Sequence, residues 1–525
     1  MEQLPKRRVT RRFAYILFAL LFLIGALVRL IGLGAMPDGV NQDEAMAAYQ
    51  AYTMVTEGLD LNGYHNPVYF EAWGSGMNAL EIYLMMPMIR LFGMTDFTIR
   101  FPQALISILC MPVLFLLFRR MFDRKTAFIG LFLYAINPWS IMMSRWALES
   151  NLAPAFLLAG LYFFVLALEK HPAFYLLSAL MYGLCLYTYA IVCLVVPVIL
   201  LLQILYALIA KKARVTLYTA GFVVIVGLMA IPLLLLIAVN RCWIPEIKTA
   251  WFSVPHLASW RQRDLSLGNL TSLQSFSRLF ELLVSQSDGT VYGSFDRFGL
   301  YYLFSMPLIL LGLVATIRKC IAKFRSRTFS LEAFLLIQLL AAVLACLLLK
   351  GININRVNCI HIPMILFCAV GVRQLANLKW KVVVQTVVAA YCISFLAFTG
   401  YYFGEGQTVL SDQYRPGTKE AILYAKDLTT DTIVCRIHGT YAKVLYYLKM
   451  PLEQYHANIV YVDPTYPEPA SFDQFAFENP QKMETGDPVY IIEDDFIASY
   501  EAAGYTVERF DRMAVAYLPD AVNGG

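Results

Sequence analysis

Three stretches of the sequence place polar side chains next to long apolar runs. The first, VNQDEAMAAYQAY at residues 40–52, puts Asp43 and Glu44 side by side. A carboxylate in such a place can act as a general base that takes a proton from a hydroxyl nucleophile. Two acids also suit the first turn of a helix, where they interact favourably with the helix dipole. The pair alone leaves both interpretations open.

The second and third stretches carry arginines. In NPWSIMMSRWALESNL, Arg145 and Glu149 stand four residues apart, so on a helix they would share one face. An ordinary ion pair explains that spacing as well as a substrate site does. In GININRVNCIHIP, Arg356 lies in a very short connection between two apolar runs. Its planar guanidinium suits a phosphate group, and snorkelling to lipid headgroups is the alternative.

Weaker candidates lie in the polar segment that follows the first apolar run. His65 in LNGYHNPVYFEAWG can contact a substrate, although a surface-loop histidine has no such role in most proteins. Tyr49, Tyr64, Tyr69 and Trp73 can stack on a sugar ring. Interfacial aromatic belts explain most side chains of this kind.

The sequence has no motif of a soluble catalytic domain. It lacks a glycine-rich phosphate loop after a strand, a CxxC pair, HExxH and GxSxG. Histidine, cysteine and carboxylate residues do not cluster with metal-ligand spacing, so we predict no metal site. A divalent cation that bridges Asp43 or Glu149 to a phosphate stays compatible with the pattern.

The composition is that of an integral membrane protein. Of 525 residues, 59% are hydrophobic and 15% charged, and the mean hydropathy is +0.59. The net charge of +5 comes from short basic clusters between apolar runs, so we predict no nucleic-acid partner. Most of the ten cysteines lie in apolar segments, which argues against a disulfide framework.

Eleven apolar runs are long enough to be read as transmembrane helices. The run at 174–210 must cross twice because basic residues flank both of its ends. The first run has no cleavage site after it and is predicted to be a retained span. The predicted spans are 13–33, 101–118, 126–143, 152–168, 174–189, 190–210, 215–238, 300–317, 331–349, 358–372 and 382–403.

The basic clusters predict which way the chain is oriented. They occupy every second connection, which places those connections and the N-terminus in the cytoplasm. Segments 34–100, 239–299 and 404–525 then lie outside. The predicted division is a membrane domain, 1–403, and a small extracytoplasmic α/β domain, 404–525, with helices and alternating strands. The stretches DEAMAAYQAYTMV and ALEIYLMMPMIRLFG are amphipathic and could lie along the membrane surface. The clusters are 6–12, 119–125, 211–214, 318–327 and 373–381.

Four stretches, in their order along the chain, together resemble the GT-C type membrane glycosyltransferases that use polyprenyl-phosphate sugars. They are GVNQDEAMAAY, FTIRFPQAL, NPWSIMMSRWALESNL and NRVNCIHIPMI. The nearest likeness is to protein O-mannosyltransferases and bacterial aminoarabinose transferases, and the sequence is similar to glycosyltransferase family 39. Two positions depart from the pattern: Val357 stands where tyrosine is usual after the arginine, and Glu149 where aspartate is frequent.

The resemblance implies a polytopic bundle of about eleven helices and a polyprenyl-phosphate sugar as donor substrate. In such enzymes the aspartate of the acidic pair serves as catalytic base, which implies that role for Asp43. The acceptor, whether a protein, a lipid or a cell-wall glycan, is left open. The supporting or substrate-binding residues that we expect around Asp43 are Glu44, Arg145, Glu149, Arg356, His65 and Tyr64.

The expected function is therefore that of an inverting glycosyltransferase of the cell membrane. Two other classes of function are alternatives. A transporter or flippase of lipid-linked glycans would need the same kind of helical bundle. Such proteins place charged groups near the middle of the membrane, whereas Asp43, Glu149 and Arg356 are predicted at one boundary. A sensor that binds through its external tail would not need Asp43 at all.

Overall fold

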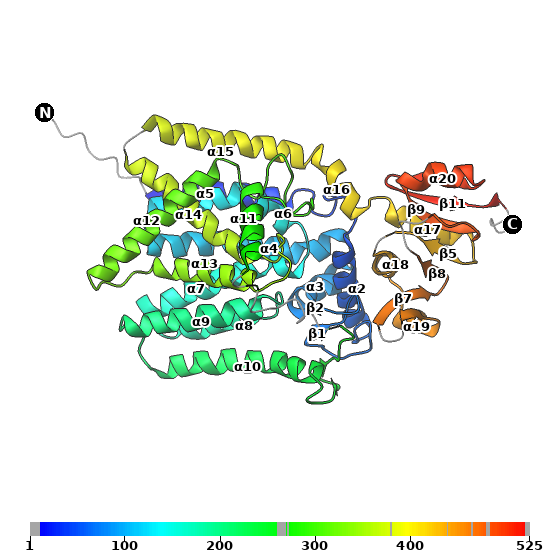
Figure 1. Cartoon of the computed structure of the whole chain (residues 1–525), viewed down its shortest axis with the longest axis horizontal. Coiled ribbons are helices and arrows are strands. Elements are labelled where there is room, and N and C mark those ends of the chain that lie inside the picture. The colour runs from blue at the N-terminus through cyan, green and yellow to red at the C-terminus, as the bar shows by residue number, and fades with distance from the viewer. Residues whose placement is uncertain are drawn as a thin grey trace.

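The structure is a computed structural model of the whole chain, and it describes residues 11–259, 269, 272–378, 381–437, 439–463, 466–478 and 483–519. A bundle of long helices forms one end of the molecule, and a mixed sheet with short helices forms the other (Figure 1). The N-terminal part of the basic cluster at 6–12 lies outside the described residues.

Within this described part, eight helices are long and apolar enough to cross a membrane. They are α1 (Arg11–Leu30), α4 (Asp96–Met121), α7 (Ala153–Glu169), α9 (Val192–Ile209), α10 (Leu217–Asn240), α12 (Ser305–Arg325), α14 (Asn358–Asn377) and α15 (Lys381–Tyr402). A ninth span is bent by 56° between α5 (Arg124–Ile136) and α6 (Pro138–Ser144). Two shorter apolar helices, α8 (Phe174–Cys185) and α13 (Ala333–Leu347), complete the set. Each of the eleven predicted spans therefore has its helix.

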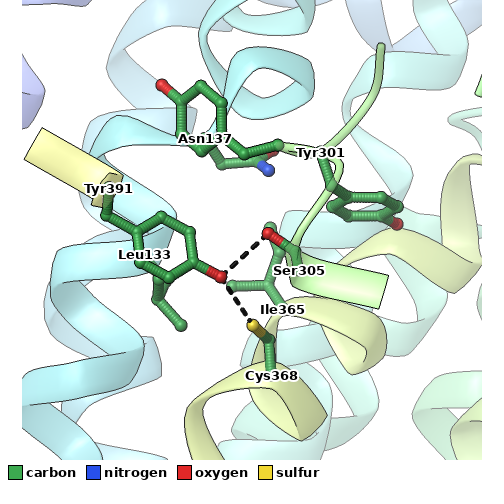
Figure 2. Close-up of a pocket in the computed structure, with 8 residues that line it drawn as sticks. Leu133, Asn137, Tyr301, Ser305, Ile365, Cys368 and Tyr391 are labelled. Carbon is green, nitrogen blue, oxygen red and sulfur yellow. Dashed lines mark hydrogen bonds between the residues drawn. The ribbon is translucent and has the colours of Figure 1, made fainter. Parts of the chain in front are cut away.

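The helices of the bundle pack through small residues and hydrogen bonds. A side chain at Gly312 of α12 or Gly371 of α14 would overlap the backbone of the other helix, which is the close approach typical of membrane helices. The outermost helix α15 is tied to the bundle by Tyr391, whose hydroxyl lies 2.8 Å from Ser305 Oγ and 3.1 Å from Cys368 Sγ. Figure 2 shows these three side chains converging beside a cavity of about 10 Å³, room for about one water molecule.

Three helices, α2 (Gln42–Thr56), α3 (Ala79–Phe92) and α11 (Leu273–Ser285), and several shorter elements lie in the predicted outside segments that precede the C-terminal part. The helices α2 and α3 form over the two amphipathic stretches. Most side chains of α2 are buried, and the helix lies between the bundle and the C-terminal sheet (Figure 1). Its position relative to the membrane surface stays a prediction. The shorter elements are β1 (Tyr69–Phe70), β2 (Met77–Asn78), η1 (Glu149–Asn151), β3 (Ile247–Lys248) and β4 (Ser253–Val254).

The C-terminal part is an α/β unit built on a seven-stranded sheet of order β10-β11-β9-β5-β8-β7-β6. The central β5 is parallel to both neighbours, and the other pairs are antiparallel. The strands are β5 (Ile433–Cys435), β6 (Val460–Asp463), β7 (Tyr466–Phe472), β8 (Phe475–Phe477), β9 (Val489–Glu493), β10 (Thr506–Phe510) and β11 (Met513–Tyr517). The helices are α16 (Gly406–Tyr414), α17 (Thr418–Leu428), α18 (Thr440–Leu448), α19 (Leu452–Ala457), η4 (Asp494–Phe496) and α20 (Ile497–Ala502).

One hydrophobic core joins this sheet to the segment between α1 and α4. It contains Met46 of α2, Ile82 of α3, Val444 of α18 and Ile491 of β9. The C-terminal unit is therefore packed against the helix that begins with the acidic pair, and its position relative to Asp43 is fixed by apolar burial.

Candidate active site

Asp43 lies in the first turn of α2, at the end of the bundle that faces the C-terminal sheet. The helix begins there because Asn41 caps it: the Asn41 side chain accepts a hydrogen bond of 2.9 Å from the Asp43 backbone N–H. The Asp43 side chain is half-buried. Its Oδ1 accepts a hydrogen bond of 3.1 Å from the indole Nε1 of Trp73. One carboxylate oxygen is therefore held in place by an N–H donor from another segment.

Glu44 is fully buried and points into the protein. Its Oε1 accepts from Arg100 Nε at 3.0 Å and from the Ala147 backbone N–H at 2.9 Å. Its Oε2 accepts from Arg100 Nη2 at 3.0 Å and from the Asn41 backbone N–H at 3.1 Å. The buried charge is thus paired and fully hydrogen-bonded, as such a charge must be. Glu44 connects three segments and has the geometry of a residue that orients the start of α2.

Arg100 was not among the expected site residues, although it stands in the stretch FTIRFPQAL. It is fully buried near the start of α4, and it donates to the carbonyl oxygens of Pro37 at 2.7 Å and Gly39 at 2.6 Å as well as to Glu44. The sequence did contain a signal for this residue: Arg100 is a lone arginine inside an apolar helix, and an arginine in such a place needs a buried partner.

The expectation that Arg145 and Glu149 share one helix face is wrong. Helix α6 ends at Ser144, and Glu149 begins the separate 3-10 helix η1. Pro138 and the cap Asn137 break the span before this point and leave only a seven-residue helix. The two side chains therefore take different partners.

Arg145 donates hydrogen bonds to backbone carbonyl oxygens, and Glu149 accepts a hydrogen bond from a backbone N–H group. The Arg145 terminal nitrogens donate to the carbonyl oxygens of Val28 and Arg29, at 3.2 and 3.1 Å, and of Met36 at 2.7 Å. These contacts hold the end of α1. Glu149 Oε2 accepts a short hydrogen bond from the Asn78 backbone N–H.

Asn358 ties the third polar stretch to the second. It lies at the start of α14, accepts from Trp139 Nε1 at 2.8 Å, and donates to Asn151 Oδ1 at 2.8 Å. Arg356 precedes it in the loop after α13, is half-buried, and donates to the Gly351 carbonyl at 3.0 Å. The structure thus links all three polar stretches. Glu44 accepts a hydrogen bond from Ala147, and the segment 137–151 is hydrogen-bonded to Asn358, which directly follows the Arg356 loop.

Glu81 is a second acid that the sequence analysis did not single out. It lies on α3, is 1% exposed, and neither carboxylate oxygen has a hydrogen-bond partner among the residues that the structure describes. Burial, together with the nearby carboxylates of Glu44 and Glu149, raises the pKa of Glu81 to about 8. Glu81 is therefore protonated at neutral pH, which keeps it from adding a further negative charge.

The segment between α10 and α12, which is predicted to lie outside, also reaches the site. Tyr292 accepts a hydrogen bond of 2.9 Å from Asn41, and its ring stacks on Trp146 with centroids 4.6 Å apart. Burial and, after it, the Asp43 carboxylate raise the pKa of Tyr292 to about 12. Segments that are far apart in the sequence thus form the surroundings of Asp43.

The other expected aromatic and histidine residues have different surroundings. Tyr64 is buried with Lys248 4.6 Å above its ring, and His65 Nδ1 is 3.0 Å from the Gly58 carbonyl. The Tyr49 and Tyr69 hydroxyls donate to backbone carbonyls and both rings are buried, which identifies them as packing residues. Of the aromatic residues expected in this loop, Trp73 has a hydrogen bond to Asp43.

No group of three or more His, Cys, Asp or Glu side chains within the described ranges is placed to hold a metal ion. The carboxylates near the site have protein donors instead: Trp73 for Asp43, and Arg100 for Glu44. A cation that bridges a carboxylate to a phosphate would need the substrate as a ligand, so that option stays a prediction.

Comparison with known proteins supports the resemblance. Residues 80–243 match the family described as dolichyl-phosphate-mannose-protein mannosyltransferase, and no curated protein matches the sequence. ArnT from Cupriavidus metallidurans bound to undecaprenyl phosphate superposes with a TM-score of 0.58 at 13% identity, covering 98% of this chain and 100% of that chain. Its apo state gives 0.57 at 14%, covering 97% and 99%.

An archaeal enzyme shares the architecture over a smaller part of its length. The apo oligosaccharyltransferase of Archaeoglobus fulgidus gives a TM-score of 0.51 at 14% identity, covering 84% of this chain and 64% of that chain. These identities show a common fold, and the family match over residues 80–243 supports the resemblance. The chain has the GT-C fold of membrane glycosyltransferases, and the general activity supported is glycosyl transfer from a polyprenyl-phosphate carrier.

Proposed function

We propose that the protein is an inverting glycosyltransferase that moves a sugar from a polyprenyl-phosphate carrier to an acceptor at the outer face of the membrane. The observation that carries this proposal is the Asp43 carboxylate, held by Trp73 at the boundary of the bundle. The structural relatives support a lipid-linked donor, because ArnT is bound to undecaprenyl phosphate. An archaeal AglB complex contains dolichol-phosphate and an inhibitory peptide.

The proposed reaction is a direct displacement at the anomeric carbon. The acceptor oxygen forms the new bond to that carbon while its proton passes to Asp43, and the bond to the phosphate oxygen breaks. The phosphate leaves as an anion and needs no proton if a cation stabilises it. Arg356 is our candidate for that cation, because its guanidinium can make two parallel bonds to phosphate oxygens. Glycoside hydrolysis differs, since there an acid must protonate the leaving oxygen.

The proposed orientation follows from the two ends of the bundle. The connection between α9 and α10, which contains the basic residues 211–214, lies at the end away from the C-terminal sheet (Figure 1). Basic connections stay in the cytoplasm, so the sheet and the Asp43 site would face outward and the N-terminus inward. The acceptor is then a protein, lipid or cell-wall glycan at the outer face.

Asp43→Asn tests the role of the base. The variant keeps the shape of the side chain and removes the proton acceptor, so sugar transfer should fall by about a hundredfold or more. The assay measures transfer of labelled sugar from a panel of polyprenyl-phosphate hexoses and pentoses to envelope fractions of cells that lack the protein. Asp38→Asn, at an exposed acid in the same segment, is the matched control. Near wild-type transfer by Asp43→Asn, or a product that retains the donor's anomeric configuration, would refute the mechanism.

Arg356→Ala tests the donor side. Because a charge-assisted bond to phosphate is lost, binding of undecaprenyl phosphate should weaken by about tenfold or more. Arg356→Lys should restore only part of it, since lysine lacks the planar fork. Arg278→Ala removes an exposed arginine near this loop, and this variant should bind undecaprenyl phosphate normally. Equal affinity in the wild type and Arg356→Ala would exclude Arg356 as the phosphate ligand.

A further inference from the structure

The C-terminal unit lies directly on the helix that begins with the acidic pair. The Tyr49 hydroxyl of α2 donates to the Met450 carbonyl, just after α18, at 2.6 Å. At the other end of α18, Gly439 has φ +67° and contacts Gln42, so that any larger side chain would overlap Gln42. Both ends of α18 thus lie against α2, and its N-terminal end lies at Gln42, the residue before Asp43.

Trp73 connects α18 to the Asp43 carboxylate. The indole N–H donates to Asp43 Oδ1 at 3.1 Å, and the ring meets Tyr441 of α18 edge to face, with centroids 4.9 Å apart and planes at 65°. Tyr441 is buried and also packs against Phe477 of β8, with centroids 6.2 Å apart. A continuous line of contacts therefore runs from the sheet, through two aromatic rings, to the carboxylate.

The backbone of Trp73 explains why this support matters. Its φ is +55°, in the left-handed region that bulky residues rarely adopt. Such a conformation persists only when the surrounding structure holds it. The Tyr441 ring packs against the indole, and the edge-to-face geometry is the favourable one for two aromatic rings. Without that ring, the indole would lose an apolar contact that helps to keep it in this conformation.

We propose that Tyr441 is a positioning residue for Asp43, so that the C-terminal unit sets the orientation of the base through Trp73. This inference rests on the proposed function. A general base must lie within hydrogen-bond reach of the proton that it abstracts, and a small displacement of a reacting group is costly in rate. The external unit then contributes to the chemical step itself, in addition to any contact with the acceptor.

The experiment compares full-length variants in the sugar-transfer assay at saturating donor. Tyr441→Ala should lower kcat by about three- to tenfold, the range that the energy of one aromatic pair allows. Binding of undecaprenyl phosphate should not change, because the donor phosphate is assigned to a different loop. Tyr441→Phe keeps the ring and should have near wild-type kcat. Tyr424→Ala is the matched control, since Tyr424 packs on Phe510 and Tyr517 of the same sheet. It should leave kcat unchanged.

A double-mutant cycle separates positioning from general loss of structure. Trp73→Phe removes the indole donor, so adding Tyr441→Ala to it should lower kcat by less than about twofold further. Additive losses, or equal losses in Tyr441→Ala and Tyr424→Ala, would overturn the inference while leaving the proposed function intact. If Tyr441→Ala does not fold, Tyr441→Leu takes its place in the same cycle. A wild-type protein without sugar transfer would instead refute the proposed function.

Discussion

Replacing Glu44 by glutamine should destabilise the protein far more than replacing Asp43 by asparagine. Each Glu44 oxygen accepts two hydrogen bonds: Oε1 from Arg100 Nε and Ala147 N, and Oε2 from Arg100 Nη2 and Asn41 N. A glutamine side chain has one acceptor oxygen and one NH₂ group. In either orientation the NH₂ group would face two N–H donors, and the buried Arg100 charge would lose its counter-charge.

The expected cost is about 3–5 kcal/mol in the free energy of unfolding, the usual result of breaking a buried ion pair by removing one partner. Sugar transfer should fall as well, because Glu44 holds the start of α2. It should fall less than in Asp43→Asn, which is expected to keep the fold but removes the proposed base. Chemical denaturation of the purified protein in detergent measures the first effect, and the sugar-transfer assay measures the second.

Arg100→Gln tests whether the Glu44–Arg100 ion pair is the cause of this stabilisation. If Glu44 and Arg100 stabilise the protein through each other, the double variant should be less destabilised than the sum of the two single variants. Strictly additive losses would show that the two side chains act independently. A Glu44→Gln protein as stable as the wild type would show that the buried geometry around Glu44 does not have the energetic role assigned to it.

Two further predictions concern Glu81 and the membrane orientation. Because the pKa of Glu81 rises from 4.5 to about 8, the unfolded chain loses this proton at a lower pH than the folded protein does, so stability should fall as pH rises through this window. Glu81→Gln should therefore be more stable than the wild type at about pH 9, by up to roughly 5 kcal/mol at about 1.4 kcal/mol per pKa unit. This gain in stability should vanish near pH 4. Thermal unfolding of both proteins between these pH values measures the difference, and a difference that does not change with pH would contradict the prediction. An impermeant thiol reagent should label the exposed Cys242 in intact cells, but Cys320 only after permeabilisation; the reverse pattern would invert the orientation.

The regular parts of the fold could be predicted because their signals are local. Length and hydropathy located every span, including the pair at 174–210, which forms α8 and α9. In the C-terminal part, the runs DTIVCRI, NIVYV, PVYIIED, VERF and MAVAYL predict strands. These runs coincide with β5, β6, β9, β10 and β11. The short strands β7 and β8 were not predicted, since Tyr466–Phe472 contains two prolines and Phe475–Phe477 is only three residues long.

Contacts between distant segments could not be read from the sequence. Nothing local to Arg100 says that its partner is Glu44, 56 positions earlier. The spacing of Arg145 and Glu149 suggested a shared helix, but Pro138 had already moved the helix boundary. Cys435 lies in the polar C-terminal part of the sequence and is nevertheless buried on β5. In each case tertiary packing decides the partner, and local pattern does not.

The acidic pair shows how neighbouring residues can take opposite environments. Asn41 begins α2, so Asp43 and Glu44 occupy consecutive positions of its first turn and point about 100° apart. That angle directs Glu44 into the protein, where Arg100 and two backbone N–H groups neutralise its charge, and leaves Asp43 half-buried beside Trp73. If both acids served only as a charged start of the helix, the helix dipole alone would explain them. That explanation does not account for the buried Arg100, which is paired with Glu44. The arrangement favours a division in which Glu44 fixes the backbone and Asp43 meets the substrate.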